Sequence, residues 1–186
     1  MMETPYFLRC FYLYNMALFN FKKKINKKDL SQLLYSQAKQ LSLGEYSDLR
    51  GKGGNFETAP LRESDEEIFI HERLVLIFWI VDLILQEKGR GIMAYIHETY
   101  FKDIGILDNN DESKKEMDFI INRYREYYDA YKDSDYLWLR GIINKNILRE
   151  KSFHLNARDD YLTAMDFSTL VRVISDFLKK YNIVED

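Results

Sequence analysis

The sequence has few of the residues that form turns between strands, few that cross-link a chain through disulfides, and few histidine or cysteine side chains that bind metals. Its 186 residues include one cysteine, two prolines, eight glycines and three histidines. A single cysteine, Cys10, excludes an internal disulfide. Sheet-rich chains of this length need more turn-forming residues, so the scarcity of proline and glycine favours helices. We therefore predict an all-α fold. We also predict a single domain, because the chain is too short to form two domains that each bury a sizeable hydrophobic core.

The three histidines do not form the usual metal-binding patterns. His71, His97 and His154 are never four residues apart, as in the zinc helix, and none has a glutamate three positions before it, as in di-iron bundles. The sequence also lacks the Gly-x-Ser-x-Gly turn of hydrolases and the P-loop of nucleotide-binding proteins. We expect no metal and no cofactor, and the missing motifs lean against an enzyme.

The charge balance is slightly acidic, and the first apolar stretch is interrupted. A net charge of −3 is unusual for a protein that binds duplex DNA through a basic face. Residues 6–21 are mostly apolar, but Arg9, Asn15 and Asn20 break the run, so no membrane span is expected. A lysine-rich stretch follows the run, the reverse of the order in a secretory signal, with lysines at Lys22, Lys23, Lys24, Lys27 and Lys28. We expect a buried first helix and a cytoplasmic protein.

Apolar residues recur at helical spacing along most of the chain. The segment 74–85 is apolar on every side apart from Asp82, which predicts that its helix is surrounded by others. Two capping boxes, Ser64 with Glu67 and Ser113 with Glu116, suggest helix starts. The pattern predicts a bundle of about six to seven helices, with the central one over 64–88 and the others over 5–22, 29–43, 92–104, 113–131, 135–149 and 166–182.

One long segment without helical spacing separates the second and third predicted helices. Residues 44–63 contain Gly51, Gly53, Gly54 and Pro60. Loops of this length are uncommon in compact domains and tend to be functional or disordered. We predict a long glycine-containing loop over 44–63.

Three residues stand out as candidates for a binding pocket. Asp82 lies within an apolar run, where a carboxylate needs partners or a proton. Trp79 lies one helical turn away from it, and His97 falls in the apolar stripe of the next helix. A pocket for a small molecule or a lipid near Asp82 is therefore one hypothesis. For Asp82 the alternative is an ion pair or hydrogen bonds with a residue of another helix, and for His97 it is a hydrogen-bonded position in the core.

A second hypothesis comes from the segment that ends the predicted helix over 135–149. Arg149 is followed, after four residues, by His154. This spacing resembles the Arg-x4–6-His motif of HEPN ribonucleases, an all-helical family. The resemblance implies metal-independent RNA cleavage, with Arg149 and His154 of two subunits facing each other across a dimer. Histidine suits acid–base chemistry near neutral pH, and arginine holds phosphate with two parallel hydrogen bonds.

The missing catalytic motifs and the aromatic-rich helices favour a third hypothesis, which we rank first. It is a non-enzymatic protein-interaction module, acting as an adaptor or a regulator. Its partner would be a protein, and a homodimer is compatible with it. Nucleic acid is expected as a partner only if the ribonuclease hypothesis holds. Exposed aromatic side chains would support the interaction hypothesis.

Overall fold

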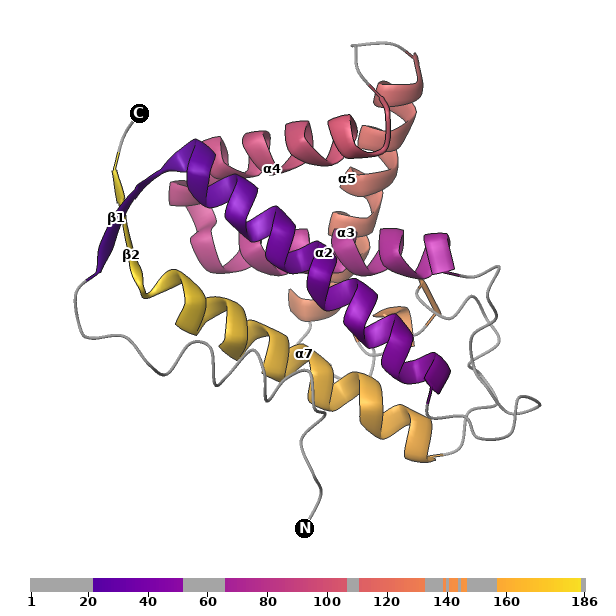
Figure 1. Cartoon of the computed structure of the whole chain (residues 1–186). Coiled ribbons are helices and arrows are strands. Elements are labelled where there is room, and N and C mark those ends of the chain that lie inside the picture. Colours follow the sequence, from indigo (N-terminus) through magenta and orange to yellow (C-terminus); the bar gives the residue numbers. More distant parts are fainter. Residues whose placement is uncertain are drawn as a thin grey trace.

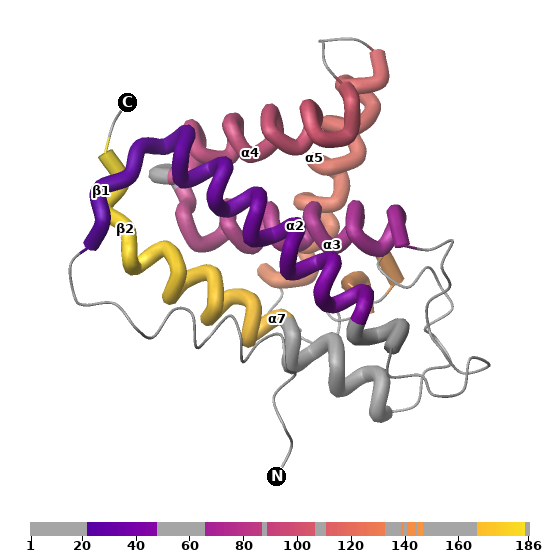
Figure 2. The backbone as a smooth tube through the Cα atoms, viewed as in Figure 1, coloured from indigo at the N-terminus to yellow at the C-terminus, as the bar shows by residue number. Residues whose placement is uncertain are grey.

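Figure 1 draws in colour the parts of the chain that the computed structural model describes, and Figure 2 shows the same view as a tube, with the helix ends 48–51 and 157–166 also in grey. The described residues are 22–51, 66–106, 111–132, 139, 141–143, 145–146 and 157–184. Most of the predicted first helix over 5–22 therefore lies outside the described residues. So do four residues discussed above: Cys10, Ser64, Arg149 and His154.

The described chain is all-α apart from two short paired strands, which confirms the predicted fold class. Figure 1 shows α2 and α7 running across the molecule, with both strands at one end. Residues 139, 141–143 and 145–146 are also helical. In chain order the elements are β1 (Lys23–Asn26), α2 (Lys27–Gly51), α3 (Glu66–Leu85), the short 3-10 helix η2 (Gln86–Gly89), α4 (Arg90–Asp103), α5 (Asp111–Lys132), α7 (Ala157–Leu178) and β2 (Tyr181–Val184).

Helix α3 is the centre of the bundle, as its sequence predicts. The side chains of residues 74–81 are at most 3% exposed. Helices α2, α5 and α7 all pack against α3. Exposing apolar side chains to water is unfavourable, so a helix that is apolar on every face is stable only when several neighbouring helices cover it. The α-helix ends at Leu85 and continues as η2, where Gln86 has a φ of 51°.

The predicted loop over 44–63 is wrong in its first part, because α2 continues to Gly51. Glycine inside a helix costs about 1 kcal/mol relative to alanine, so Gly44 was a reasonable place to end the helix. The next two residues offset that cost through tertiary contacts. Glu45 binds Arg73 of α3, and Tyr46 is 4% exposed against the ring of Phe69. The rest of the predicted loop, residues 52–63, lies outside the described residues.

The start of α5 differs from the capping box in the sequence. Helix α5 begins at Asp111, so Ser113 lies inside its first turn and is not the N-cap. The Glu116 carboxylate accepts a hydrogen bond from Tyr100 of α4. The described part of α3 begins at Glu66, and the predicted capping residue Ser64 lies outside the described residues.

The C-terminal segment also differs from its prediction. Helix α7 starts at Ala157 and stops at Leu178, where a helix over 166–182 was predicted. The chain then forms β2, which pairs in parallel with β1, Lys23 lying opposite Tyr181 and Ile25 opposite Ile183. Strands of four residues are too short to produce a recognisable alternation. The two strands pair because the two ends of the described chain lie side by side, which the sequence of neither strand indicates.

Helix α4 ends as predicted. Gly105 has a φ of +81°, the left-handed conformation that glycine adopts without steric cost, and it follows directly after the C-cap residue Ile104. Beside this end, Asp103 accepts hydrogen bonds from Tyr35 at 2.8 Å and from Lys39 at 2.5 Å, both on α2. These contacts hold α4 against α2 at one end. Ser31 holds the other end, because its hydroxyl donates to the carbonyl oxygen of Ile92 at 2.9 Å.

Candidate functional site

Trp79, one of the three predicted pocket residues, is fully buried among other rings. Its exposed fraction is 0%. The ring centroid lies 5.3 Å from that of Tyr127 on α5 and 5.8 Å from that of Phe167 on α7, with Tyr131 at 6.0 Å. Aromatic pairs at these separations stabilise a core beyond the area they bury. Trp79 therefore joins α3 to α5 and α7 and presents no free surface to a ligand.

His97 is held in a hydrogen bond between α4 and α5. Its Nε2 lies 3.1 Å from the hydroxyl oxygen of Tyr124, and its ring meets that of Phe78 edge-on. Burial lowers the pKa of His97 to about 4, because an imidazolium loses its hydration inside the protein. At neutral pH the ring is uncharged, and it can serve either as donor or as acceptor to Tyr124.

Asp82 lies close enough to the same pair to act on it electrostatically. Partial burial raises the pKa of Asp82 above its usual range. Its charge in turn helps to keep the Tyr124 hydroxyl protonated, since the pKa of Tyr124 is raised first by burial and then by the Asp82 carboxylate. The predicted residues Asp82 and His97 therefore both act on Tyr124, His97 through a hydrogen bond and Asp82 through its charge. This arrangement lacks an activated nucleophile, because Tyr124 is made less acidic by its surroundings.

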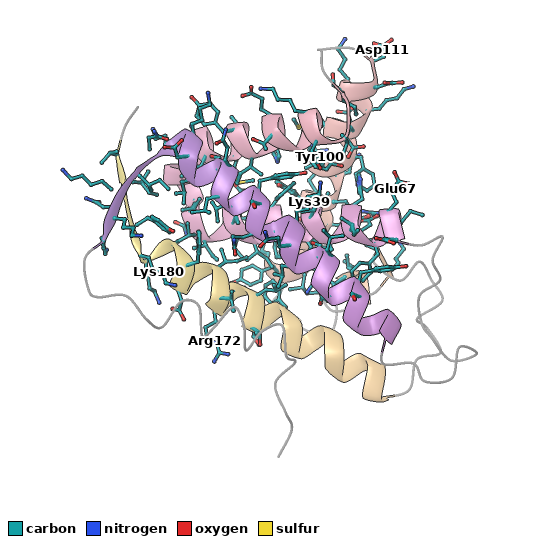
Figure 3. All side chains as sticks on the ribbon, viewed as in Figure 1. Lys39, Glu67, Tyr100, Asp111, Arg172 and Lys180 are labelled. Carbon is teal, nitrogen blue, oxygen red and sulfur yellow. The ribbon has the colours of Figure 1, made fainter. Side chains whose placement is uncertain are left out.

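A second polar cluster, which sequence reasoning missed, joins α3, α4 and α5. The Tyr100 hydroxyl donates to Glu116 Oε1 at 2.9 Å and lies 2.9 Å from His71 Nδ1. His71 Nε2 is 3.4 Å from the same carboxylate. Burial, followed by the Glu116 charge, raises the pKa of Tyr100 above its usual range. Figure 3 labels Tyr100 among the side chains between these helices.

The Tyr100 cluster can hold three helices together, but its chemistry is that of a structural link. A tyrosine with a raised pKa is a poor base and a poor nucleophile at neutral pH. Its position in the inner stripe of α4 was predictable from helical spacing. Its partners were not, because His71 and Glu116 come from different helices.

Two partly buried ion pairs lie next to each other on α3, and sequence reasoning missed these as well. Arg73 is 2% exposed and binds both carboxylate oxygens of Glu45, at 2.5 and 2.7 Å. Its neighbour Glu72 is 6% exposed and receives two hydrogen bonds from Arg123 of α5, at 2.8 and 3.1 Å. Arg123 also binds Glu126 at 2.9 Å. Each pair has two parallel hydrogen bonds, the strongest arrangement for these groups.

The described residues hold no group of three or more histidine, cysteine, aspartate or glutamate side chains able to bind a metal ion. Among the described helices, none is long and apolar enough to cross a membrane.

Helix α5 differs from its prediction in where its apolar stripe lies. By helical spacing, the sequence predicts an inward-facing stripe of seven residues on this helix: Met117, Ile120, Ile121, Tyr124, Tyr127, Tyr128 and Tyr131. Ile120 and Tyr127 are buried, but three members of the stripe are markedly exposed: Ile121 at 39%, Tyr128 at 50% and Tyr131 at 37%. Ile121 and Tyr128 lie on one flank of the stripe, whereas Tyr131 lies nearer its centre, at the end of α5, and is partly exposed beside Trp79. We call these three residues, Ile121, Tyr128 and Tyr131, the α5 face.

The chain matches no family model, no curated protein and no solved structure.

Proposed function

We propose that this protein is a non-enzymatic interaction module and that the α5 face pairs with the same face of a second copy of the chain. The observation that carries the proposal is the exposure of Ile121, Tyr128 and Tyr131 on one helix. At 100° per residue Ile121 and Tyr128 lie about 20° apart, and Tyr131, whose ring also contacts Trp79, lies about 60° further round the helix. Their spacing of seven and then three residues is that of helices that pair lengthwise.

The charges beside the face make it self-complementary. Asp118 and Lys132 are both exposed, and each is seven residues from Arg125. In an antiparallel pair centred on Arg125, each Asp118 faces a Lys132 of the second copy. Ile121 then lies within one residue of the second copy's Tyr128. The two arginines meet at the centre, and each has an Asp129 of the second copy about 6 Å along the helix axis.

The polar clusters are consistent with a module that performs no catalysis. His97, Tyr100 and Tyr124 are engaged in hydrogen bonds between helices, and burial is the main cause that favours the neutral form of each. Trp79 is enclosed by rings, which disfavours a pocket there. Arg149 and His154, on which the ribonuclease hypothesis depends, lie outside the described residues.

Self-association is the direct test. The face is small, so we expect a transient dimer with a dissociation constant in the range of about 1–100 μM. Sedimentation velocity across that range should show a monomer–dimer equilibrium for the wild-type protein. Tyr128→Arg puts a charge at the middle of the face and should leave a monomer. Ile104→Arg is a matched control, because Ile104 is 42% exposed on α4's end and outside the face.

Charge reversal tests the antiparallel arrangement. Asp118→Lys and Lys132→Asp should each weaken the dimer, because each places like charges opposite one another. The double variant should restore it. A wild-type protein that stays monomeric throughout the range, or a Tyr128→Arg variant that dimerises normally, would contradict the proposal.

A further inference from the structure

Tyr131 belongs both to the α5 face and to the cluster of rings around Trp79. Its side chain is 37% exposed, so part of it is open to a partner. Another part packs inward, because its ring meets that of Trp79 edge-on, with the centroids 6.0 Å apart, and lies 6.3 Å from that of Phe167. Tyr131 therefore joins the exposed face to the core.

Phe167 brings α7 into this contact. Its side chain is buried, and its ring stacks on that of Trp79, with the centroids 5.8 Å apart and the planes 28° from parallel. Trp79 comes from α3, Phe167 from α7 and Tyr131 from α5. Three helices thus meet around one partly exposed ring, and a shift of α7 would move the surface against which Tyr131 rests.

The place of Tyr131 on α5 makes its conformation depend on these neighbours. It is the last residue but one of the helix, which ends at Lys132. It also lies about 60° round the helix from Tyr128, so its ring extends the face only when it is held toward that flank. Side chains choose among a few staggered rotamers, and packing decides which one is populated. The rings of Trp79 and Phe167 supply that packing on the inner side of Tyr131.

We propose that Phe167 is a positioning residue for the α5 face, so that the packing of α7 against α3 sets the strength of self-association. This inference rests on the proposed pairing of the face with a second copy. It follows that pairing also stabilises α7, because a coupling free energy between two sites acts equally in both directions. Helix α7 thus regulates a surface that lies on another helix.

Two buried phenylalanines of α7 give a matched pair of variants. Phe167→Leu removes the ring contacts with Tyr131 and Trp79, whereas Phe177→Leu removes a ring that lies 5.2 Å from that of Tyr181, at the other end of α7. The two phenylalanines are 9% and 8% exposed, so the substitutions remove similar burial. By sedimentation velocity, the dissociation constant of the dimer should rise about fivefold for Phe167→Leu and stay within about twofold of the wild type for Phe177→Leu. Urea denaturation checks that both variants are folded.

Hydrogen exchange tests the coupling in the reverse direction. At concentrations that favour the dimer, the amides of residues 167–178 should exchange about fivefold more slowly in the wild type than in the monomeric variant Tyr128→Arg. The amides of residues 27–39 serve as the internal reference, because this part of α2 packs on α4. Their exchange should be equal in the two proteins.

The outcomes separate this inference from the proposal on which it rests. A wild-type protein that stays monomeric at every concentration would overturn both. A dimer that the two phenylalanine variants weaken equally would overturn this inference alone, because general loss of burial in α7, and not the contact with Tyr131, would then be responsible. A dissociation constant unchanged by Phe167→Leu, or equal exchange of α7 in monomer and dimer, would have the same consequence.

Discussion

Helices α3 and α5 place charged and apolar side chains in opposite ways. Helix α3 buries Glu72 and Arg73 at its first turns, whereas α5 exposes Ile121, Tyr128 and Tyr131. The two helices touch each other, and Arg123 of α5 supplies the partner of Glu72. Burial therefore depends on what surrounds a side chain as much as on its polarity.

The difference shows what each arrangement does for the protein. A buried charge is tolerated when hydrogen bonds replace its lost water, so the α3 pairs set how α2 and α5 sit on α3. An exposed ring contributes little to folding and stays available to another molecule. The charges inside the protein are thus structural, and the rings outside are the candidates for recognition.

The largest expected effect comes from removing one partner of the α3–α5 pair. Arg123→Met leaves Glu72 buried without its two hydrogen bonds. We expect a loss of about 3–5 kcal/mol in the free energy of unfolding, measured by urea denaturation. The double variant Glu72→Leu, Arg123→Met should recover much of this loss, because no buried charge remains. A single variant as stable as the wild type would show that Glu72 reaches water.

An intermediate effect should follow acidification, through His97. Its pKa of about 4 in the folded protein lies below the ordinary value of 6.5. The unfolded chain therefore takes up a proton more readily between these values, so stability is full above pH 6.5 and falls as the pH drops toward 4. Between pH 7 and pH 5 we expect His97 to account for a loss of about 2 kcal/mol.

His97→Gln isolates the contribution of the histidine, because glutamine can keep the hydrogen bond to Tyr124 but does not titrate. Between pH 7 and pH 5 the free energy of unfolding, measured by urea denaturation, should change less in this variant than in the wild type. Asp82 acts in the opposite direction, since its raised pKa favours the folded state in acid. Both proteins share this contribution, so the difference between them reports His97. Parallel pH curves would contradict the assignment.

The smallest effect on stability is expected on the α5 face. Tyr128 is 50% exposed, so Tyr128→Ser should change the free energy of unfolding by less than about 1 kcal/mol. The same substitution should still weaken self-association. A larger loss of stability would mean that Tyr128 belongs to the core, and the contrast between α3 and α5 would disappear.

Sequence reasoning was most successful where one helix carries the whole signal. The run around Trp79 is apolar on every face, and it is the buried centre of the bundle. Gly105 ends α4, as expected from its position after the apolar stripe. Sequence reasoning was least successful where a contact joins two different helices or strands. Helix α2 extends past Gly44 because Glu45 and Tyr46 find partners on α3.

The candidate sites show the same limit. Asp82 and His97 were recognised as unusual from their apolar neighbours in the sequence. That both act on Tyr124 of α5 could not be read from any one segment. The buried partners of Glu72 and Arg73 lie 51 and 28 residues away. From the sequence alone, a charged residue in the first turns of a helix is expected to be solvent-exposed. The position of another helix must be known before burial can be predicted.

By itself the sequence determined the all-helical class, the central place of α3 and the scarcity of metal-binding patterns, because these follow from local spacing and composition. The tertiary structure decided which flank of α5 faces solvent, which charges are buried in pairs and how β1 meets β2. Hydrophobic spacing specifies that a helix has an inner face. Only the packing of its neighbours determines how much of that face is covered.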